Sequence, residues 1–392
     1  MKDCGHSRTR HNADPPGAPA QAPPAAVGLG PHGQSCENKS GMWIRLFLLP
    51  GLLAVPSPSA NAASGYIGAA ACSSCHPAQG LRQASTGHAI ALRRTADHPL
   101  AAAFFREHKR TRPPNFQFEF LAGPAVRISE LSKAVDVPID WAFGAGSQAV
   151  TFVSRVDAGH YVELFLSYYR ALDKLGPTPG QQDLKPNGLA EAAGLYYRTR
   201  DPQTGIDGCF TCHSTGPIRF DAAQSIQPAE EGVRCEACHG PGERHVAAAK
   251  AGDTAVRRLI DNPARWTASE QLDFCGRCHR PPAATGQQID FSYAWNVRHQ
   301  PVYLARSACF RKSNGALSCI TCHPPHEPLA KSSSQYNRQC SRCHQTQPAA
   351  CGTNCVDCHM PRVSPQPPLT FTNHWIGIYD SGAKLAPKLR RQ

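Results

Sequence analysis

The chain has 392 residues, with 41 Lys and Arg against 29 Asp and Glu, and a formal net charge of +12. A basic excess of this size is compatible with nucleic acid or an anionic membrane as a partner, but it carries no information about fold. No segment after residue 62 is apolar enough to cross a membrane, which argues against an integral membrane protein.

The first predicted elements are a leader and an export signal. Residues 1–41 are rich in Pro, Ala and Gly without periodicity, so we expect a disordered leader that lies upstream of the true start or is discarded. Residues 42–62 combine Arg45, an apolar stretch and an Ala-x-Ala end, the pattern of a cleaved signal peptide. This predicts a soluble mature chain that begins near Ala63 and is periplasmic or otherwise exported.

A Cys-x-x-Cys-His pattern then occurs seven times. Numbered in chain order, the copies are motif 1 (72–76), motif 2 (209–213), motif 3 (235–239), motif 4 (275–279), motif 5 (319–323), motif 6 (340–344) and motif 7 (355–359). Zinc ribbons and iron–sulfur sites also use cysteine pairs, but neither requires His after the second Cys. The pattern is typical of c-type haem attachment, so it predicts seven covalently bound haem c groups, with zinc or disulfide knuckles as the alternative.

The motif spacing suits attachment from a single helical turn. Residues three and four apart share one helix face, so two sulfurs can bond the porphyrin edge while the imidazole reaches the iron. The predicted attachment residues are Cys72, Cys75, Cys209, Cys212, Cys235, Cys238, Cys275, Cys278, Cys319, Cys322, Cys340, Cys343, Cys355 and Cys358. The predicted motif ligands to iron are His76, His213, His239, His279, His323, His344 and His359.

Seven cofactors in so short a chain restrict the fold. The chain offers roughly fifty residues for each haem, which is too few for an ordinary apolar core. The macrocycles must therefore supply much of the buried apolar surface. We expect a mainly α and loop, haem-dominated multihaem cytochrome c fold with a small antiparallel β insert. The predicted segments are a first haem module (63–110), the β insert (111–170), a linker (171–205), a six-haem domain (206–363) and a C-terminal tail (364–392).

Two patterns support the β insert. Phe116, Phe118 and Phe120 alternate within residues 115–120, as on one face of a half-buried strand. Two apolar runs flank an Asp-Ala-Gly-His turn, and this pattern predicts a hairpin over residues 149–166. The Gly- and Pro-rich residues 175–188 then indicate a surface linker.

Each iron needs a sixth ligand if it is six-coordinate. Met360 directly follows His359 and is too close to cap the same iron. Of the eight other histidines in the mature chain, we favour His88, His245, His326 and His374 as axial ligands, with His245 and His326 each serving a haem other than that of the motif just before it. His299 stays open, whereas His98, His108 and His160 are more typical of exposed residues. Most haems should therefore be bis-histidine and of low potential, although two unbound histidines would leave one iron face open.

Two cysteines remain outside the motifs of the mature chain. Cys309 and Cys351 are candidates for a disulfide in an oxidising compartment, or for buried thiols.

Several longer runs resemble the multihaem cytochromes c that include the tetrahaem electron acceptor of hydroxylamine oxidoreductase, that oxidase, and pentahaem nitrite reductase. They are "YIGAAACSSCHPAQ", "FGAGSQAVTFVSRVDAGHYVELFLSYY", "GVRCEACHGPGERH", "SACFRKSNGALSCITCHPPH" and "CVDCHMPR". The resemblance implies stacked haem pairs, a helical and loop-rich fold and periplasmic redox work. It does not extend to the nitrite reductase catalytic site, because that site has Lys in place of the motif His and all seven motifs here end in His.

We therefore predict a periplasmic carrier that exchanges electrons with a redox donor and a redox acceptor. Haem propionates offset much of the positive charge, so no nucleic acid partner is expected. One alternative is a reductase or oxidase of small nitrogen or sulfur compounds with one five-coordinate haem. Another is a structural subunit of a larger redox complex. The sequence does not decide the oligomeric state.

Overall fold

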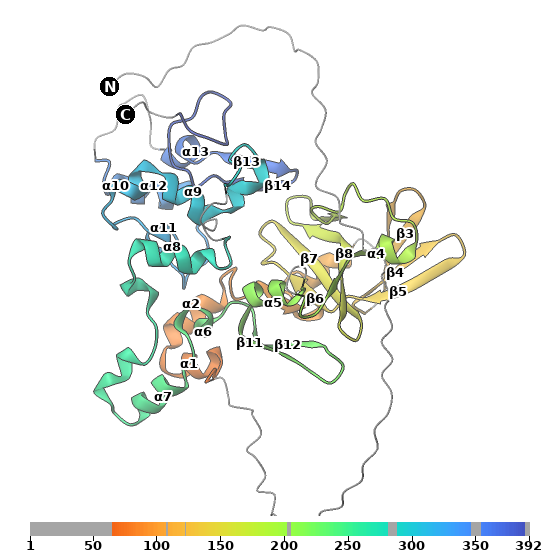
Figure 1. The fold of residues 1–392 in the computed structure, drawn as a ribbon, viewed down its shortest axis with the longest axis horizontal. Helices are drawn as coiled ribbons and strands as arrows, with labels where there is room; N and C mark the ends of the chain where they lie inside the picture. The colour runs from red at the N-terminus through yellow and green to blue at the C-terminus, as the bar shows by residue number, and fades with distance from the viewer. Residues whose placement is uncertain are drawn as a thin grey trace, which may run out of the picture. The chain divides into compact units, whose positions relative to one another are not determined.

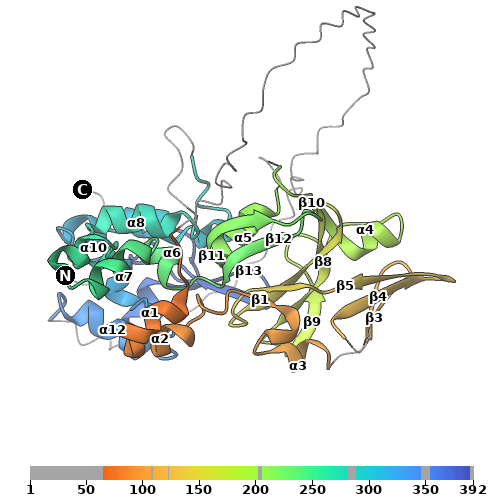
Figure 2. The ribbon, with the colours of Figure 1, turned by 90° about the horizontal axis from the view of Figure 1, so that it is seen from below.

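A computed structural model describes residues 65–106, 109–121, 123–201, 205–280, 288–345 and 354–388. The chain divides into a unit Met1–Ala62 and a unit Ala63–Gln392, and the predicted leader and signal peptide lie outside the described residues. Within the second unit, most helices gather on one side and the larger sheets on the other (Figures 1 and 2). No helix in the described ranges is long and apolar enough to cross a lipid bilayer.

The helices are short and are separated by loops. The α-helices are α1 (Ala69–Cys75), α2 (Pro77–Ala84), α3 (Ala101–Phe104), α4 (Leu189–Ala193), α5 (Asp207–His213), α6 (Cys235–His239), α7 (Glu243–Lys250), α8 (Ala268–Gly276), α9 (Gln300–Arg306), α10 (Ala308–Lys312), α11 (Cys319–Cys322), α12 (Ser333–Ser341) and α13 (Cys355–His359). The 3-10 helices are η1 (Thr95–Asp97), η2 (Thr254–Arg258), η3 (Pro263–Arg265) and η4 (Ala294–Arg298). Short helices are what the frequent prolines and the closely spaced motifs dictate.

All the strands that the structure describes pair antiparallel. The largest sheet has the order β1 (Leu92–Arg94), β6 (Trp141–Phe143), β7 (Ala149–Asp157), β8 (His160–Tyr169) and β10 (Gly194–Arg198), with β9 (Lys174–Pro177) also paired to β8. A second sheet has the order β2 (Lys109–Arg112), β3 (Phe116–Leu121), β4 (Ala125–Glu130) and β5 (Lys133–Pro138). Two separate hairpins are β11 (Ser214–Phe220) with β12 (Ile226–Glu231), and β13 (Arg362–Gln366) with β14 (Leu369–Thr372).

The strand and hairpin predicted from the sequence are both present. Phe116, Phe118 and Phe120 on β3 are buried in a core shared by the two larger sheets. Strands β7 and β8 pair through the predicted turn, with Asp157 opposite His160. Period-two alternation and turn composition therefore located these elements correctly.

The β region is larger than the predicted insert at 111–170. Strand β1 precedes it, and β9, α4 and β10 occupy the segment 171–205 that we expected to be a linker, so the linker prediction is wrong for these elements. The reason is the length of β8, which has ten residues. Strand β7 pairs with one edge of β8, and the opposite edge is long enough for two more strands. Strands β10 and β9 cover that edge end to end, β10 along His160–Leu164 and β9 along Leu166–Tyr169.

Residues 364–388 of the predicted C-terminal tail are likewise part of the fold. Strand β14 ends at Thr372, so His374 follows the strand instead of lying within it. Trp375 is buried in a small core with Val297, Tyr303 and Val363, which fixes this end of the chain against η4 and α9.

Candidate haem sites

In each motif the backbone closes one helical turn. The His backbone N–H donates to the carbonyl of the first Cys in motifs 1, 4, 5 and 6, at 2.9–3.0 Å, and motifs 2, 3 and 7 lie within α5, α6 and α13. All fourteen motif cysteines are partly or well exposed to solvent. Each pair of sulfurs is therefore reachable from the same side as its histidine, as thioether attachment requires.

Four motif histidines face a second imidazole that comes from elsewhere in the chain. The ring centres are 6.3 Å apart for His76 and His245, 5.9 Å for His88 and His279, 6.0 Å for His239 and His326, and 6.2 Å for His323 and His374. The structure thus brings all four favoured axial candidates opposite a motif histidine. His245 and His326 each face the histidine of a motif other than the one just before them.

The ring separations fit an iron between the rings. An imidazole nitrogen binds a transition metal at about 2 Å and lies roughly 1.1 Å from the ring centre, so two axial rings have centres ~6.2 Å apart. Aromatic rings that pack directly on each other have centres anywhere from about 4.5 to 7 Å apart. The four imidazole pairs instead share nearly the same separation. The residues present therefore fit bis-histidine haem at motifs 1, 3, 4 and 5.

Backbone carbonyls orient several of these rings. The Nδ1 atoms of the following histidines lie 2.7–3.0 Å from a carbonyl oxygen: His213 (Ala91), His239 (Asp261), His245 (Val256), His359 (Gly377) and His374 (Thr372). Because a carbonyl only accepts, Nδ1 must carry the proton in each ring. The lone pair of Nε2 is then free, which is the tautomer that a metal ligand needs.

The other histidines are placed differently. His98 is only 3% exposed, so its predicted exposure is wrong, and its Nε2 donates to Gly144 while its Nδ1 accepts from the Leu100 N–H. His160 lies near the surface and bonds Asp157. Nε2 of His299 lies 3.3 Å from Arg280, and its buried Nδ1 has no partner among the described residues. His108 and Cys351 lie outside the described residues, so the structure does not test the disulfide; Cys309 is partly buried.

Three motif histidines have no facing imidazole within the described ranges. They are His213, His344 and His359. His213 instead contacts the edge of Phe143, with ring centres 5.2 Å apart. Motifs 2, 6 and 7 are therefore the places where an iron could keep an open face.

Sulfur contacts between motifs place the attachment sites in a continuous series. Cys72 of motif 1 contacts Cys235 of motif 3, Cys275 of motif 4 contacts Cys319 of motif 5, and Cys340 of motif 6 contacts Cys355 of motif 7. Cys238 also lies near Cys275, and Cys322 lies near Cys340, so the three pairs follow one another. Motif 2 branches from motif 4, because Cys212 contacts Cys278.

Burial sets the charge state of the paired rings. It lowers the pKa of His279 to about 4, with a further contribution from His88, and it lowers the pKa of His374 to about 4. Both imidazoles are therefore neutral near pH 7, as ligation requires.

Sequence reasoning missed the groups that orient the rings. The carbonyls of Val256 and Asp261 fix two of them, yet every residue has a carbonyl, so no residue type marks their role. The pairing of each axial histidine with its motif also has no sequence signal, because the partners come from distant segments.

Comparisons of the sequence with known proteins found cytochromes. Residues 182–240, which include motifs 2 and 3, match the family "Cytochrome c554 and c-prime". The chain is 24% identical over 181 residues to "Multiheme cytochrome MtrA" of Shewanella baltica, covering 41% of this chain and 47% of that relative. The chain thus spans about half the length of the curated relative that it matches. A solved structure, "Outer Cell Wall Cytochrome OcwA", is 15% identical with a TM-score of 0.47, covering 80% of this chain and 79% of that one.

Proposed function

We propose that this chain, a multihaem c-type cytochrome, is an exported electron carrier with seven covalently attached haems, at least four of them bis-histidine. When bound, haem c supplies a reversible one-electron iron couple. The observation that carries the proposal is the recurrence of facing imidazoles at 5.9–6.3 Å in four places.

In this proposal the protein residues have three tasks. The motif cysteines hold each group covalently at a fixed place, and the facing histidines close both sides of the metal site against substrates. Paired imidazoles also favour a low potential, since Met in place of His raises it. The sulfur contacts from motif 1 through motifs 3, 4, 5, 6 and 7 support a continuous path for electrons between a redox donor and a redox acceptor.

We place the protein nearest the group that contains the electron acceptor of hydroxylamine oxidoreductase. The "CHPPH" and "CHMP" runs of motifs 5 and 7 support this finer placement. The Ala-x-Ala signal ending at Ala62 supports export to the periplasm.

A second candidate function is a reductase or oxidase of small nitrogen or sulfur compounds. The observation that favours it is the lack of a facing imidazole, among the described residues, at His213, His344 and His359. An open iron face at one of these motifs would admit a small ligand.

Electron paramagnetic resonance of the oxidised holo-protein, with and without cyanide, separates the two functions. A carrier gives low-spin signals that cyanide leaves unchanged. A high-spin signal that cyanide abolishes would instead support the enzyme. Material that is colourless, or whose intact mass equals that of the bare polypeptide, would contradict both.

A further inference from the structure

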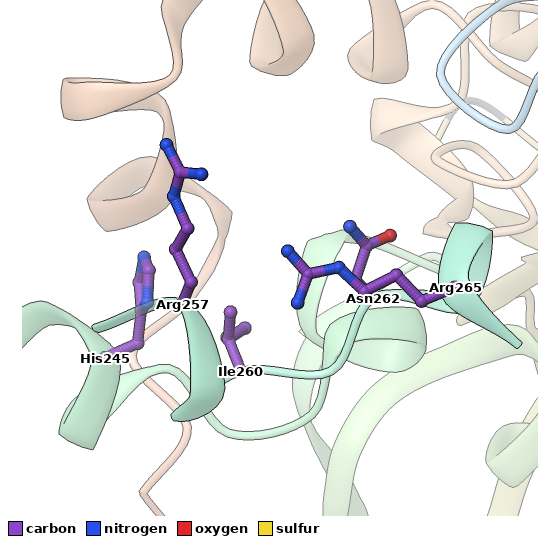
Figure 3. Close-up of a pocket in the computed structure, with 5 residues that line it drawn as sticks. All are labelled: His245, Arg257, Ile260, Asn262 and Arg265. Carbon is purple, nitrogen blue, oxygen red and sulfur yellow. The ribbon is translucent and has the colours of Figure 1, made fainter. Parts of the chain in front are cut away.

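A cavity beside His245 contains two arginines and no carboxylate. It is lined by His245, Arg257, Ile260, Asn262 and Arg265, with Ile260 between the two arginines in Figure 3. Arg257 lies in η2 and Arg265 ends η3, and both are solvent-exposed. Neither forms an ion pair within the part of the chain that the structure describes.

The loop that carries these arginines also orients histidines of two candidate haem sites. The carbonyl of Val256, next to Arg257, accepts from Nδ1 of His245 at 2.9 Å. The carbonyl of Asp261 accepts from Nδ1 of His239 at 2.7 Å, and the Asp261 N–H donates to the His239 carbonyl at 3.0 Å. The backbone of the arginine-bearing loop is thus bonded directly to His245, the ring that faces His76.

We propose that Arg257 and Arg265 bind the propionate carboxylates of the haem held between His76 and His245. This inference rests on the proposed function, since it requires a haem at that pair. A porphyrin edge placed in this cavity brings carboxylates that need cationic partners, and the planar guanidinium group matches a carboxylate in two-point geometry. The Ile260 side chain supplies apolar contact between the two cations.

The arginines set the potential of this haem as well as its position. Reduction adds one negative charge, so nearby cations favour the reduced state and raise the potential. Because both side chains are exposed, solvent and salt screen much of this effect.

Redox titration of the holo-protein, followed by electron paramagnetic resonance, tests the assignment. Arg257→Ala and Arg265→Ala should each lower the potential of one bis-histidine haem. The expected change is about fourfold in the reduction equilibrium constant, which is ~35 mV at about 59 mV per tenfold change. Arg257→Lys should restore most of the shift by keeping the charge. Arg258→Ala is the matched control, since Arg258 is the next residue of η2 and does not line the cavity.

The outcomes distinguish this assignment from the function on which it rests. Unchanged potentials in both alanine variants would overturn the arginine assignment. This holds even if the variants exchange electrons more slowly with an acidic protein. His245→Ala identifies the affected transition by converting that iron from low-spin to high-spin. If His245→Ala changes no signal, the haem site itself is refuted and the arginine assignment with it.

Discussion

Replacing Glu236 with alanine should release the N-terminal segment from motif 3. Glu236 occupies a position that the Cys-x-x-Cys-His pattern leaves free, yet it is only 2% exposed. Its carboxylate accepts from the backbone N–H groups of Ile67 at 3.0 Å, Gly68 at 2.7 Å and Gly242 at 2.7 Å. One side chain of α6 therefore holds the residues just before α1, which carries motif 1, and Gly242, which follows His239.

The magnitude follows from these three donors. A hydrogen bond to a charged group contributes about 1.5–3 kcal/mol, and a buried donor left without a partner carries a further cost. The Gly242 bond is buried, whereas the bonds from Ile67 and Gly68 are partly buried, so water can replace part of their loss. We expect Glu236→Ala to lower the free energy of unfolding by about 3–4 kcal/mol.

Guanidinium unfolding of the holo-protein, followed by far-ultraviolet circular dichroism, measures this loss. The control is Glu270→Ala, which removes an exposed capping-box carboxylate that bonds Thr267 at the start of α8 and should cost about 1 kcal/mol. If Glu236→Ala is no more destabilising than Glu270→Ala, the reasoning about buried donors is refuted.

Three further predictions concern ligation, packing and pH. His326→Ala should convert one low-spin iron to high-spin in the paramagnetic resonance spectrum, whereas His160→Ala should leave the spectrum unchanged. Gly232→Ala should lower the free energy of unfolding by about 2–4 kcal/mol in denaturant titration, because Gly232 has φ +76° and a new Cβ would lie 2.1 Å from a backbone oxygen. The control is Gly252→Ala, which has φ +71° but open space around it and should cost only about 1 kcal/mol. Equal losses in the two variants would contradict the prediction. Burial raises the pKa of Glu163, so the folded state keeps this proton longer and stability falls as pH rises through the raised value. Glu163→Gln should therefore raise the melting temperature above that range and leave it unchanged below; no difference at high pH would exclude the effect.

The sequence predicted local features better than long-range ones. Motif spacing predicted the helical turn of each motif, and alternating phenylalanines predicted β3, because both patterns depend only on neighbouring residues. Strand β9 was missed because its Gly and Pro give it the composition of a loop, and β10 was missed because its five residues follow a Gly- and Pro-rich stretch. Only the length of β8 creates a place for these two strands. His98 was expected at the surface, but Gly144 and Leu100 satisfy both ring nitrogens, so its burial carries little cost.

The histidine pairs show the same limit. The local settings of His88, His245, His326 and His374 marked them as candidate ligands, but not which motif each would face. His88 lies near motif 1 in sequence and faces His279 of motif 4. The sequence assigned His245 to a haem other than that of the motif just before it, yet only the folded chain identifies His76 as its partner.

Anomalous diffraction at the iron absorption edge, on crystals of the holo-protein, tests the central claim most directly. The account predicts iron peaks between the imidazoles of His76 and His245, His88 and His279, His239 and His326, and His323 and His374, each about 2 Å from both ring nitrogens. Iron that lies away from these pairs, or a zinc signal at the motifs in its place, would contradict it.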